Sequence, residues 1–412
     1  MRTILHSDCN NFYATVETVF DPKLRGKPLV VCGDPGLRHG IVLAKSYAAR
    51  RCGIITGETV WQAQRKCPDL ILVGADQRKY LSFSKKMRAI CRQYTSRVEP
   101  FGLDENWLDV TGHRLGGEEI AAHIRRAARE ELGITVSIGI SYNKVFAKLG
   151  SDMRKPDATT VISPNNYQQK AWPLPVSNLL YVGPSTQAHL AQLGLYTIGD
   201  IATCSDAIIR RAFGKNGQTM QRYARGEDDA PVLSAEEADE IKSIGNSTTT
   251  PRDIACDEDA KAVLYLLSDS VATRLRAHRF ACRTVSVWMR DVALNSFERQ
   301  CRLPMASDIS GEIAQAALSL VREHYSWALP LRSLGVRGSD LQPTTDSGQT
   351  SLLSEPGRRK HAAVEQALDG IRSRYGHASI QRGLMLSQRD LTNVNPVDDH
   401  ALQPLAAMRG RD

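Results

Sequence analysis

The fold is decided by residues 98–110, Val-Glu-Pro-Phe-Gly-Leu-Asp-Glu-Asn-Trp-Leu-Asp-Val, which predict two short strands joined by a tight turn at Leu103-Asp104-Glu105. The turn presents two adjacent carboxylates at the tip of a hairpin. Earlier in the chain, residues 2–8 read as a short buried strand that ends at Asp8. A third carboxylate therefore stands at the end of a second predicted strand.

The segments around this hairpin give the order of elements in the amino-terminal half. Helical spacing of apolar residues predicts one helix over residues 83–94 and another over 120–133. Residues 134–140 alternate as a strand, a helix begins near Lys144, and a further strand covers residues 159–162.

The order of these elements predicts the topology. With residues 9–74 set aside, the order is strand, helix, strand, strand, helix, strand, followed by a final helix and strand. This is typical of a ferredoxin-like split βαβ arrangement with additions. The arrangement brings the end of the first strand next to the hairpin turn, so we expect Asp8, Asp104 and Glu105 to meet in space.

The remaining segments are assigned from their composition and patterns. Residues 9–74 form a compact insertion with a strand at 28–32 and helical stretches near 11–19 and 42–52. Residues 173–227 are helical and punctuated by glycines. A second α/β unit is expected at 242–341, with helices near 258–278 and 308–325, strands near 281–293 and 331–338, and a last helix after it over 359–375.

The composition of the chain excludes several classes of protein. Its 412 residues suffice for about two to four domains, and its formal net charge is +8. No apolar run approaches the roughly 20 residues of a membrane span, and the amino terminus lacks a sustained apolar segment, so we expect neither a membrane protein nor a secreted one. Nine cysteines without a C-x-x-C pair, and ten dispersed histidines, favour a cytoplasmic location over a disulfide framework or a structural metal cluster. The basic excess is compatible with nucleic-acid binding but does not establish it.

The three converging carboxylates suggest a divalent metal site. Mg²⁺ prefers oxygen ligands and is commonly held by one or two carboxylates together with substrate phosphates. Two such ions about 3.5–4 Å apart can clamp the attacking and leaving oxygens of a phosphoryl transfer. An isolated Asp-Glu pair is more often an ordinary polar turn, so the residue types alone leave both interpretations open.

Three stretches of the sequence resemble signatures of the Y-family of translesion DNA polymerases, and most closely their DNA polymerase IV branch. They occur in the order of the family, and weaker resemblance extends to about residue 341 and into the tail. The stretches are Ser-Asp-Cys-Asn-Asn-Phe-Tyr-Ala-Thr-Val-Glu (7–17), Phe-Gly-Leu-Asp-Glu-Asn-Trp-Leu-Asp-Val-Thr (101–111) and Ser-Ile-Gly-Ile-Ser-Tyr-Asn-Lys-Val-Phe-Ala-Lys-Leu-Gly-Ser-Asp-Met-Arg-Lys-Pro (137–156).

The resemblance implies an α+β fold in the form of a right-hand polymerase. Its parts would be a ferredoxin-like catalytic palm, small fingers, a helical thumb with a helix-hairpin-helix, an α/β little finger and a C-terminal tail. The implied boundaries are 1–10 and 75–165 for the palm, 11–74 for the fingers, 166–230 for the thumb, 231–241 for a linker, 242–341 for the little finger and 342–412 for the tail.

The resemblance also implies the catalytic residues. Carried over position by position, Asp8, Asp104 and Glu105 are the metal ligands, and the main-chain carbonyl of Cys9 completes the shell of one ion. Two Mg²⁺ ions are expected, for which Mn²⁺ can substitute.

A second set of residues would bind the incoming nucleotide. Tyr13 aligns with the aromatic steric gate that excludes a ribose 2′-hydroxyl, and Phe12 precedes it. Tyr47, Arg50 and Lys155 align with contacts to the triphosphate, a role that suits the planar fork of Arg and the compact charge of Lys.

The sequence departs from the family pattern beside these residues. Ala44-Lys45-Ser46 stands where the family often has a threonine hydroxyl within reach of phosphate. We therefore expect this difference to affect nucleotide affinity more than the chemical step. Gly33 and Ile41 align with the roof over the nascent base pair.

Further stretches resemble contacts to DNA and to a partner protein. Residues 179–201 resemble a helix-hairpin-helix, whose glycines would let backbone N–H groups approach DNA phosphates. In the tail, Gln349, Leu352 and Leu353 belong to a peptide resembling the one by which bacterial polymerases dock on the sliding clamp. Candidate phosphate contacts in the little finger are Arg274, Arg276, Arg279, Arg283, Arg290 and Arg337.

The function implied is template-directed, low-fidelity DNA synthesis by a monomer that acts on primed DNA and deoxynucleoside triphosphates, away from membranes. Two alternatives stay open at this point. A nucleotidyl cyclase shares the palm fold and the paired carboxylates, and a non-catalytic DNA-binding member of the family would keep the fold without the reaction.

Overall fold

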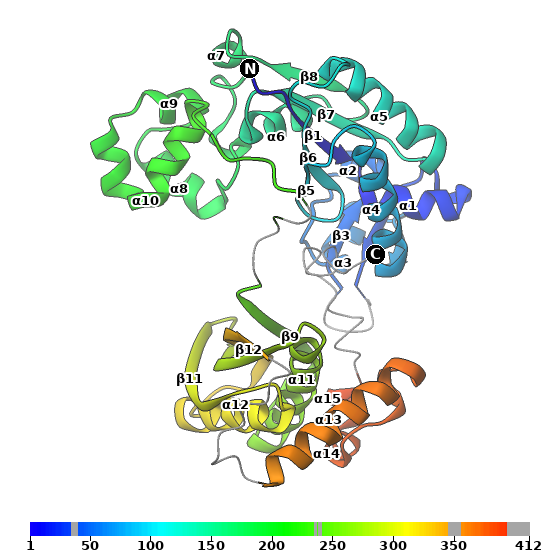
Figure 1. The fold of residues 1–412 in the computed structure, drawn as a ribbon, viewed down its shortest axis with the longest axis vertical. Coiled ribbons are helices and arrows are strands. Elements are labelled where there is room, and N and C mark those ends of the chain that lie inside the picture. The colour runs from blue at the N-terminus through cyan, green and yellow to red at the C-terminus, as the bar shows by residue number, and fades with distance from the viewer. Residues whose placement is uncertain (34–39, 235–236, 238–240, 345–355, 394–412) are drawn as a thin grey trace. The chain divides into compact units, whose positions relative to one another are not determined.

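A computed structural model describes residues 1–33, 40–234, 237, 241–344 and 356–393 (Figure 1). The chain divides into two compact units, and the division falls within the predicted linker. Unit 1 contains the described residues 1–33 and 41–237, and unit 2 contains those from 241 onward. None of the helices in the described part of the chain combines the length and the apolar character needed to cross a lipid bilayer.

Unit 1 is built on a five-stranded sheet with the strand order β5-β6-β1-β7-β8. The central strand β1 pairs antiparallel with β6 and β7, and β8 pairs parallel with β7. This is the order of a ferredoxin-like sheet with one strand added, so the predicted topology is confirmed. The strands are β1 (Ile4–Cys9), β5 (Val98–Pro100), β6 (Glu105–Asp109), β7 (Val136–Ser141) and β8 (Thr159–Ile162).

Helices cover both faces of this sheet. Leu5 of β1 belongs to the core that contains buried residues of α4 (Gln77–Arg92) and α5 (Gly117–Leu132). Ile4 belongs to a separate cluster with Ala147 of α6 (Lys144–Met153). Because successive residues of a strand point to opposite faces, His6 and Asp8 lie on the α6 side together with Ile4.

The insertion after β1 forms a small three-stranded sheet with the order β3-β2-β4 and short helices around it. The helix expected over residues 42–52 is wrong in its first part, because Val42–Lys45 forms a strand and only Tyr47–Arg51 is helical. Pairing explains the difference, since this strand satisfies one edge of β2. The elements are α1 (Phe12–Phe20), η1 (Pro22–Leu24), β2 (Leu29–Cys32), β3 (Val42–Lys45), α2 (Tyr47–Arg51), α3 (Val60–Lys66) and β4 (Ile71–Gly74).

A helical region completes unit 1. Its helices are α7 (Tyr167–Lys170), η2 (Val176–Asn178), α8 (Pro184–Gln192), α9 (Ile198–Thr203) and α10 (Asp206–Ala224). The turn between α8 and α9 contains Gly194, as the predicted helical hairpin requires. Gly199 does not have the expected role of letting backbone approach DNA. A Cβ at this position would lie 3.1 Å from Cβ of Trp172. This glycine therefore serves internal packing and not an approach to DNA.

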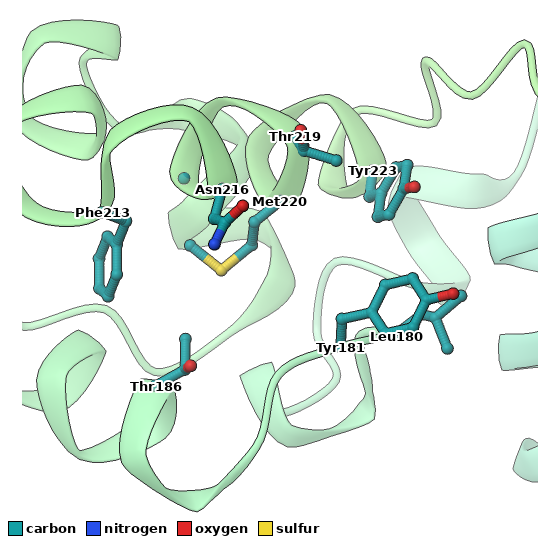
Figure 2. A pocket seen from close by; sticks show the side chains of 9 residues that line it. Leu180, Tyr181, Thr186, Phe213, Asn216, Thr219, Met220 and Tyr223 are labelled. Carbon is teal, nitrogen blue, oxygen red and sulfur yellow. The ribbon is translucent and has the colours of Figure 1, made fainter. Parts of the chain in front are cut away.

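A pocket of about 370 Å³ lies within this helical region. Gly214 has a left-handed φ of 60° and interrupts α10 beside it. Figure 2 shows Phe213 and Tyr223 at opposite ends of the pocket and the thioether of Met220 between them. Its lining residues are Leu180, Tyr181, Thr186, Phe213, Asn216, Gly217, Thr219, Met220 and Tyr223.

Unit 2 is a four-stranded antiparallel sheet with the order β11-β10-β12-β9 and two helices against it. The predicted helices and two of the strands are present, but β9 and β11 were not expected. β9 is rich in Ser and Thr and β11 in charged residues, so neither shows apolar alternation, and both lie at sheet edges. The elements are β9 (Ser243–Ile254), α11 (Asp257–Ala277), β10 (Phe280–Asp291), β11 (Ser296–Ser307), α12 (Ser310–His324) and β12 (Leu331–Pro343).

The helices near the carboxyl terminus belong to the fold of unit 2. Leu391 lies in the core of this unit. Asp269 of α11 is 1% exposed and accepts hydrogen bonds from Arg372 at 3.0 Å and Arg382 at 3.1 Å. The predicted boundary at residue 341 therefore does not end the folded unit. The helices are α13 (Pro356–Tyr375), η3 (His377–Ser379), α14 (Gly383–Ser387) and α15 (Arg389–Thr392).

The approach of α6 to the sheet depends on Gly139 of β7. A Cβ at this position would lie 1.8 Å from the carbonyl oxygen of Ala147 and 2.5 Å from the nitrogen of Ser151. Gly139→Ala must therefore displace backbone, and we expect it to lower the free energy of unfolding by about 3 kcal/mol or more. Thermal or urea denaturation of the full chain measures the effect.

Gly74→Ala is the matched control, because a Cβ there meets nothing within 4 Å. It should change the free energy of unfolding by less than about 0.5 kcal/mol. Equal effects of the two substitutions would contradict the close packing of α6 on β7.

Candidate active site

The three predicted carboxylates come together at one end of β1. Asp8 lies directly opposite Glu105 in the antiparallel pair of β1 and β6. The N–H of Cys9 donates to the carbonyl of Asp104 at 3.0 Å, which joins the turn to the end of β1. The expectation that Asp8, Asp104 and Glu105 meet in space is confirmed, and Asp8 is only 3% exposed.

Crowding and burial shift the pKa values of these groups. Burial, and then the charge of Glu105, raise the pKa of Asp8 to about 7 and that of Asp104 to about 6. Burial acts in the same direction on Glu105, but His6 and Lys148 prevail and lower its pKa to about 2. The surrounding groups therefore do not fully compensate the negative charge of the three carboxylates.

Two lysines provide part of the compensation. Nζ of Lys155 lies 2.7 Å from Oδ2 of Asp8 and 2.9 Å from Oδ1 of Asp152. Nζ of Lys148 lies 3.0 Å from Oε1 of Glu105 and 3.1 Å from Oδ2 of Asp152. Sequence reasoning identified Lys155 but missed Lys148 and Asp152. Their separation of four residues on a helix, within the third quoted stretch, was the available signal.

His6 is a second residue that the sequence reasoning missed. It is fully buried, and burial lowers the pKa of its imidazole. Nδ1 of His6 and the hydroxyl oxygen of Ser151 are hydrogen-bonded at 2.8 Å, and the same hydroxyl contacts the carbonyl of Lys148 at 2.7 Å. Nε2 of His6 then lies 3.4 Å from Oε2 of Glu105. The available signal was the period of two along β1, which places His6 and Asp8 on one face.

The donor set fits a divalent cation. One ligand atom each from His6, Asp8 and Glu105 lie within 4.8 Å of one another. Oε2 of Glu105 and Nε2 of His6 are buried and have no hydrogen-bond partner among the described residues. A cation beside the carboxylates would satisfy the first of these atoms and relieve the repulsion that raises the pKa of Asp8. Asp104 does not belong to this tightest group, although its charge acts on the same site.

Tyr13 lies near the carboxylates and is held in place by a second ring. Burial, and then the charge of Asp104, raise the pKa of Tyr13 to about 12. Its ring stacks on Tyr80 with centroids 4.1 Å apart, and the hydroxyl of Tyr80 donates to Oε1 of Glu17 at 2.7 Å. The side chain of Phe12 is 3% exposed and belongs to the core, so only its main chain is available to a nucleotide.

Two of the predicted phosphate contacts, Tyr47 and Arg50, lie on the capped helix α2. The side chain of Ser46 accepts from the N–H of Ala49 and caps α2, which carries Tyr47 and Arg50. The guanidinium of Arg50 lies 5.4 Å from the ring centre of Tyr47. Burial raises the pKa of Tyr47, and the charges of Arg50 and Lys155 oppose that shift. The structure thus brings Tyr47, Arg50 and Lys155 into one cationic neighbourhood.

The side chain of Lys45, which departs from the family pattern before α2, is hydrogen-bonded within the insertion. Nζ of Lys45 donates to the hydroxyl of Thr56 at 3.0 Å. Burial, and then the charge of Arg50, lower the pKa of Lys45. The extra cation is therefore engaged within the insertion.

The sheet of unit 2 presents a polar face opposite α11 and α12. Val285, Val287 and Met289 of β10 point into the core, so the residues between them point to the other face. Directly opposite residues of neighbouring strands share a face. This polar face contains Ser286, Trp288 and Arg290 of β10, Ser333, Gly335 and Arg337 of β12, and Ser296, Glu298 and Gln300 of β11.

The six arginines expected to contact phosphate differ in their availability. Arg276 is ion-paired with Asp369 at 2.6 Å and Glu365 at 3.2 Å inside unit 2, so it is not available to DNA. Arg274 donates to the carbonyl of Gly245 at 2.7 Å. Arg337 pairs with Glu298 on the polar face, and Nε of both Arg283 and Arg290 lacks a hydrogen-bond partner among the described residues.

Gln349, Leu352 and Leu353, the predicted clamp contacts, lie outside the described residues. The pocket of Figure 2 is lined by none of the residues predicted to act in catalysis or nucleotide binding.

Comparisons with known proteins show the family of the chain. The model of the impB/mucB/samB family matches residues 7–152, and the model of its C-terminal domain matches residues 241–352. The first match contains all three carboxylates, and the second covers the sheet of unit 2.

Relatives cover nearly the whole chain. DNA polymerase IV of Acetivibrio thermocellus is 47% identical over 397 residues, which are 95% of this chain and 100% of that protein. DNA polymerase IV of Moorella thermoacetica is 38% identical, over 93% of this chain and 96% of that protein. DNA polymerase IV 1 of Bacillus subtilis is 35% identical, over 94% of each. A solved Y-family DNA polymerase chimera shares the fold with a TM-score of 0.72 and 24% identity, over 82% of this chain and 99% of that one.

The raised pKa of Asp8 predicts that ionisation of this carboxyl lowers the stability of the protein when a chelator keeps metal away. A carboxyl whose pKa is raised on folding binds more protons in the folded state, so stability falls as pH rises from 3.8 to about 7. In the presence of a chelator, we expect Asp8→Asn to raise the free energy of unfolding at pH 8 by on the order of 2 kcal/mol. The gain should nearly vanish at pH 4. Thermal denaturation at both pH values measures it.

Asp152→Asn is the control, for which the opposite change in the free energy of unfolding is expected. Burial opposes ionisation of this residue, but Lys148 and Lys155 lower its pKa. Its substitution should therefore destabilise the protein at pH 8. A loss of stability in Asp8→Asn at pH 8, or an equal gain at both pH values, would contradict the electrostatic account.

Proposed function

The chain belongs to the Y-family of DNA polymerases and is a translesion DNA polymerase, and from this premise we propose that the carboxylates of unit 1 form its catalytic site. The observation that carries the proposal is the convergence of Asp8, Asp104 and Glu105 at one end of β1, with pKa values that a cation would correct. In the reaction, the primer 3′-hydroxyl attacks the α-phosphorus of a deoxynucleoside triphosphate, and pyrophosphate leaves.

Dependence on a divalent metal is general in this family. We assign two Mg²⁺ ions, for which Mn²⁺ can substitute, to Asp8, Asp104, Glu105 and the main-chain carbonyl of Cys9. When bound, the ions neutralise charge on the transferring phosphoryl group and favour deprotonation of the primer hydroxyl. Antiparallel pairing holds Asp8 and Glu105 in register, so the ligands are positioned before substrate arrives.

The triphosphate is bound by residues that already surround Asp8. Lys155 lies 2.7 Å from Asp8, and its compact charge would also suit a phosphate oxygen of the nucleotide. Arg50 and Tyr47 approach from α2, where the guanidinium can donate two hydrogen bonds to phosphate. Lys148 stays with Glu105 and Asp152, because it is mostly buried between them.

The DNA, which a polymerase of this family must bind, is assigned to two surfaces. One is the polar face of the unit 2 sheet, where Arg290 and Arg337 provide charge and Trp288 an aromatic surface. The other is the helical hairpin of α8 and α9, through backbone groups near Gly183 and Gly194.

Other assignments follow from the resemblance. Gln349, Leu352 and Leu353 are proposed to dock on a bacterial sliding clamp, and the protein is proposed to act as a cytoplasmic monomer. A nucleotidyl cyclase is not favoured, because the relatives match both units of the chain. A non-catalytic member is not favoured, because all three carboxylates are present.

Primer extension tests the assignment of the carboxylates. Glu105→Gln keeps the shape of the side chain and removes its charge. We expect it to lower the rate of extension on primed DNA with Mg²⁺ by about 10³-fold or more, or ~4 kcal/mol of transition-state stabilisation. DNA binding, measured separately by fluorescence anisotropy, should be retained.

Asp109→Asn removes a carboxylate from the same strand and should leave extension unchanged. Wild-type protein that does not extend a primer, or Glu105→Gln protein that extends it at the wild-type rate, would refute the proposal.

The sugar-selecting role of Tyr13 gives a separate prediction. Its ring is braced by Tyr80, so the gate should be rigid. Tyr13→Ala should raise incorporation of ribonucleotides relative to deoxynucleotides by at least about tenfold, equal to about 1.4 kcal/mol. Tyr13→Phe keeps the ring and should retain the wild-type ratio. An unchanged ratio in the alanine variant would remove the assignment.

A further inference from the structure

Tyr181 has a backbone conformation that is costly for a bulky residue. Its φ is 67°, in the left-handed region that favours glycine. The N–H of Val182 donates to the carbonyl of Leu179 at 3.1 Å, which closes a turn with Tyr181 as its third residue. A left-handed third residue is typical of a type II turn, where glycine is the ordinary choice. The chain therefore keeps a tyrosine where glycine would fit without strain.

Packing on both sides of Tyr181 holds this turn in place. Leu179 and Val182 are buried in the core of the helical region. Leu180 packs instead against the cluster that contains Trp107 of β6. Because these neighbours are anchored in two different clusters, the backbone of Tyr181 cannot relax without disturbing one of them.

Burial of the ring does not account for a tyrosine at this position. Tyr181 is 70% exposed and lies at one end of the pocket of the helical region (Figure 2). Its ring lies beside that of Tyr223, with centroids 6.4 Å apart. A side chain that buries so little apolar surface gains little hydrophobic stabilisation to offset the strain. Strained residues that persist in folded proteins cluster at functional sites, so the exposed ring points to a binding role.

The helices beside this turn suit a polyanion. α8 begins at Pro184, three residues after Tyr181, and contains no acidic residue. α10 lines the same pocket and contains one acidic residue, Asp206, which is ion-paired with Arg225 at 2.9 Å. The charge of α10 is therefore dominated by its basic residues, which favours nucleic acid as the ligand. These are Arg210, Arg211, Lys215 and Arg222, of which the first three are exposed.

The acids near Tyr181 are engaged within unit 1. Burial, and then the charges of Glu99 and Asp228, raise the pKa of Tyr181. Glu99 is ion-paired with Nζ of Lys144 at 2.6 Å, and Asp228 accepts from the N–H of Lys144 at 3.2 Å. Their charge is thus partly compensated, and the phenol remains a neutral hydrogen-bond donor.

We propose that the ring of Tyr181 contacts the sugar–phosphate backbone of primed DNA and that the strained turn is kept in order to present it. The inference rests on the proposed function, which assigns DNA to backbone groups near Gly183. Two residues of extended chain span at most about 7 Å, so the ring and these backbone groups reach neighbouring nucleotides of one strand. The flat face of the ring suits a deoxyribose, and its hydroxyl can donate to a phosphate oxygen. Such contacts do not depend on the base sequence, as the copying of any template requires.

Three substitutions of Tyr181 separate the ring from the strain. Tyr181→Ala removes the ring and keeps the left-handed residue, Tyr181→Gly removes both the ring and the strain, and Tyr181→Phe keeps both. By fluorescence anisotropy of the full chain with labelled primed DNA, we expect the alanine and glycine variants to bind at least about fivefold more weakly. The phenylalanine variant should bind within about twofold of the wild type.

Thermal denaturation of the same proteins gives the second half of the test. Tyr181→Gly should unfold at a midpoint about 2 °C or more above those of the wild type and of Tyr181→Ala, because only glycine adopts this φ without cost. A ring that served packing alone would not produce a variant that is more stable and yet binds DNA less tightly.

Tyr375→Ala is the matched control for loss of an exposed ring. Tyr375 is 66% exposed and belongs to α13, which is attached to α11 through Arg372, so its substitution should leave DNA affinity unchanged. Circular dichroism verifies that each variant is folded. The inference is overturned if Tyr181→Ala binds primed DNA as tightly as the wild type, or if Tyr181→Gly is no more stable than Tyr181→Ala. Wild-type protein that does not bind primed DNA would instead refute the proposed function.

Discussion

The crowding of three carboxylates at one end of β1, with Asp8 buried and Asp104 and Glu105 partly buried, is the constraint to which the rest of unit 1 is adapted. Like charges at low dielectric repel strongly, and the raised pKa values of Asp8 and Asp104 express that cost. The two carboxylates are nevertheless held close together, because the register of β1 with β6 places Asp8 opposite Glu105. A core on each face of the sheet holds this register, and a slip of one residue would exchange Ile4 and Leu5 between the two cores.

The elements around the carboxylates reduce the electrostatic repulsion among them but do not remove it. α6 approaches the sheet closely over Gly139 and thereby brings Lys148 and Asp152 to the site. Lys155 follows α6 and reaches Asp8. His6 and Lys148 keep Glu105 ionised, whereas burial and the charge of Glu105 leave the pKa of Asp8 near neutrality, so further positive charge beside Asp8 would be favourable.

The sequence predicts those parts of the site that depend on local pattern. The hairpin at residues 98–110 and the strand ending at Asp8 can be recognised from alternation and turn residues, and their order fixes the meeting of the carboxylates. Lys148 was not predicted, because the face of α6 that meets the sheet depends on packing with β7. β9 and β11 were not predicted, because they are edge strands rich in Ser and Thr or in charged residues and so lack apolar alternation.

A comparison within the chain indicates which buried acids are structural. Asp269 of unit 2 is as buried as Asp8, but two arginines donate to it, and Arg382 also reaches Glu365. The guanidinium groups thus match the carboxylates of this cluster, and the result is a fixed attachment of α13 and α14 to α11. At Asp8 the same chain uses two lysines shared among three carboxylates and leaves an oxygen of Glu105 without a hydrogen bond among the described residues. Lysine gives a compact charge that can change partner, whereas a bidentate arginine would hold the carboxylate permanently. The incomplete compensation at Asp8 is therefore what a site needs if cations and a triphosphate are to enter it and leave again.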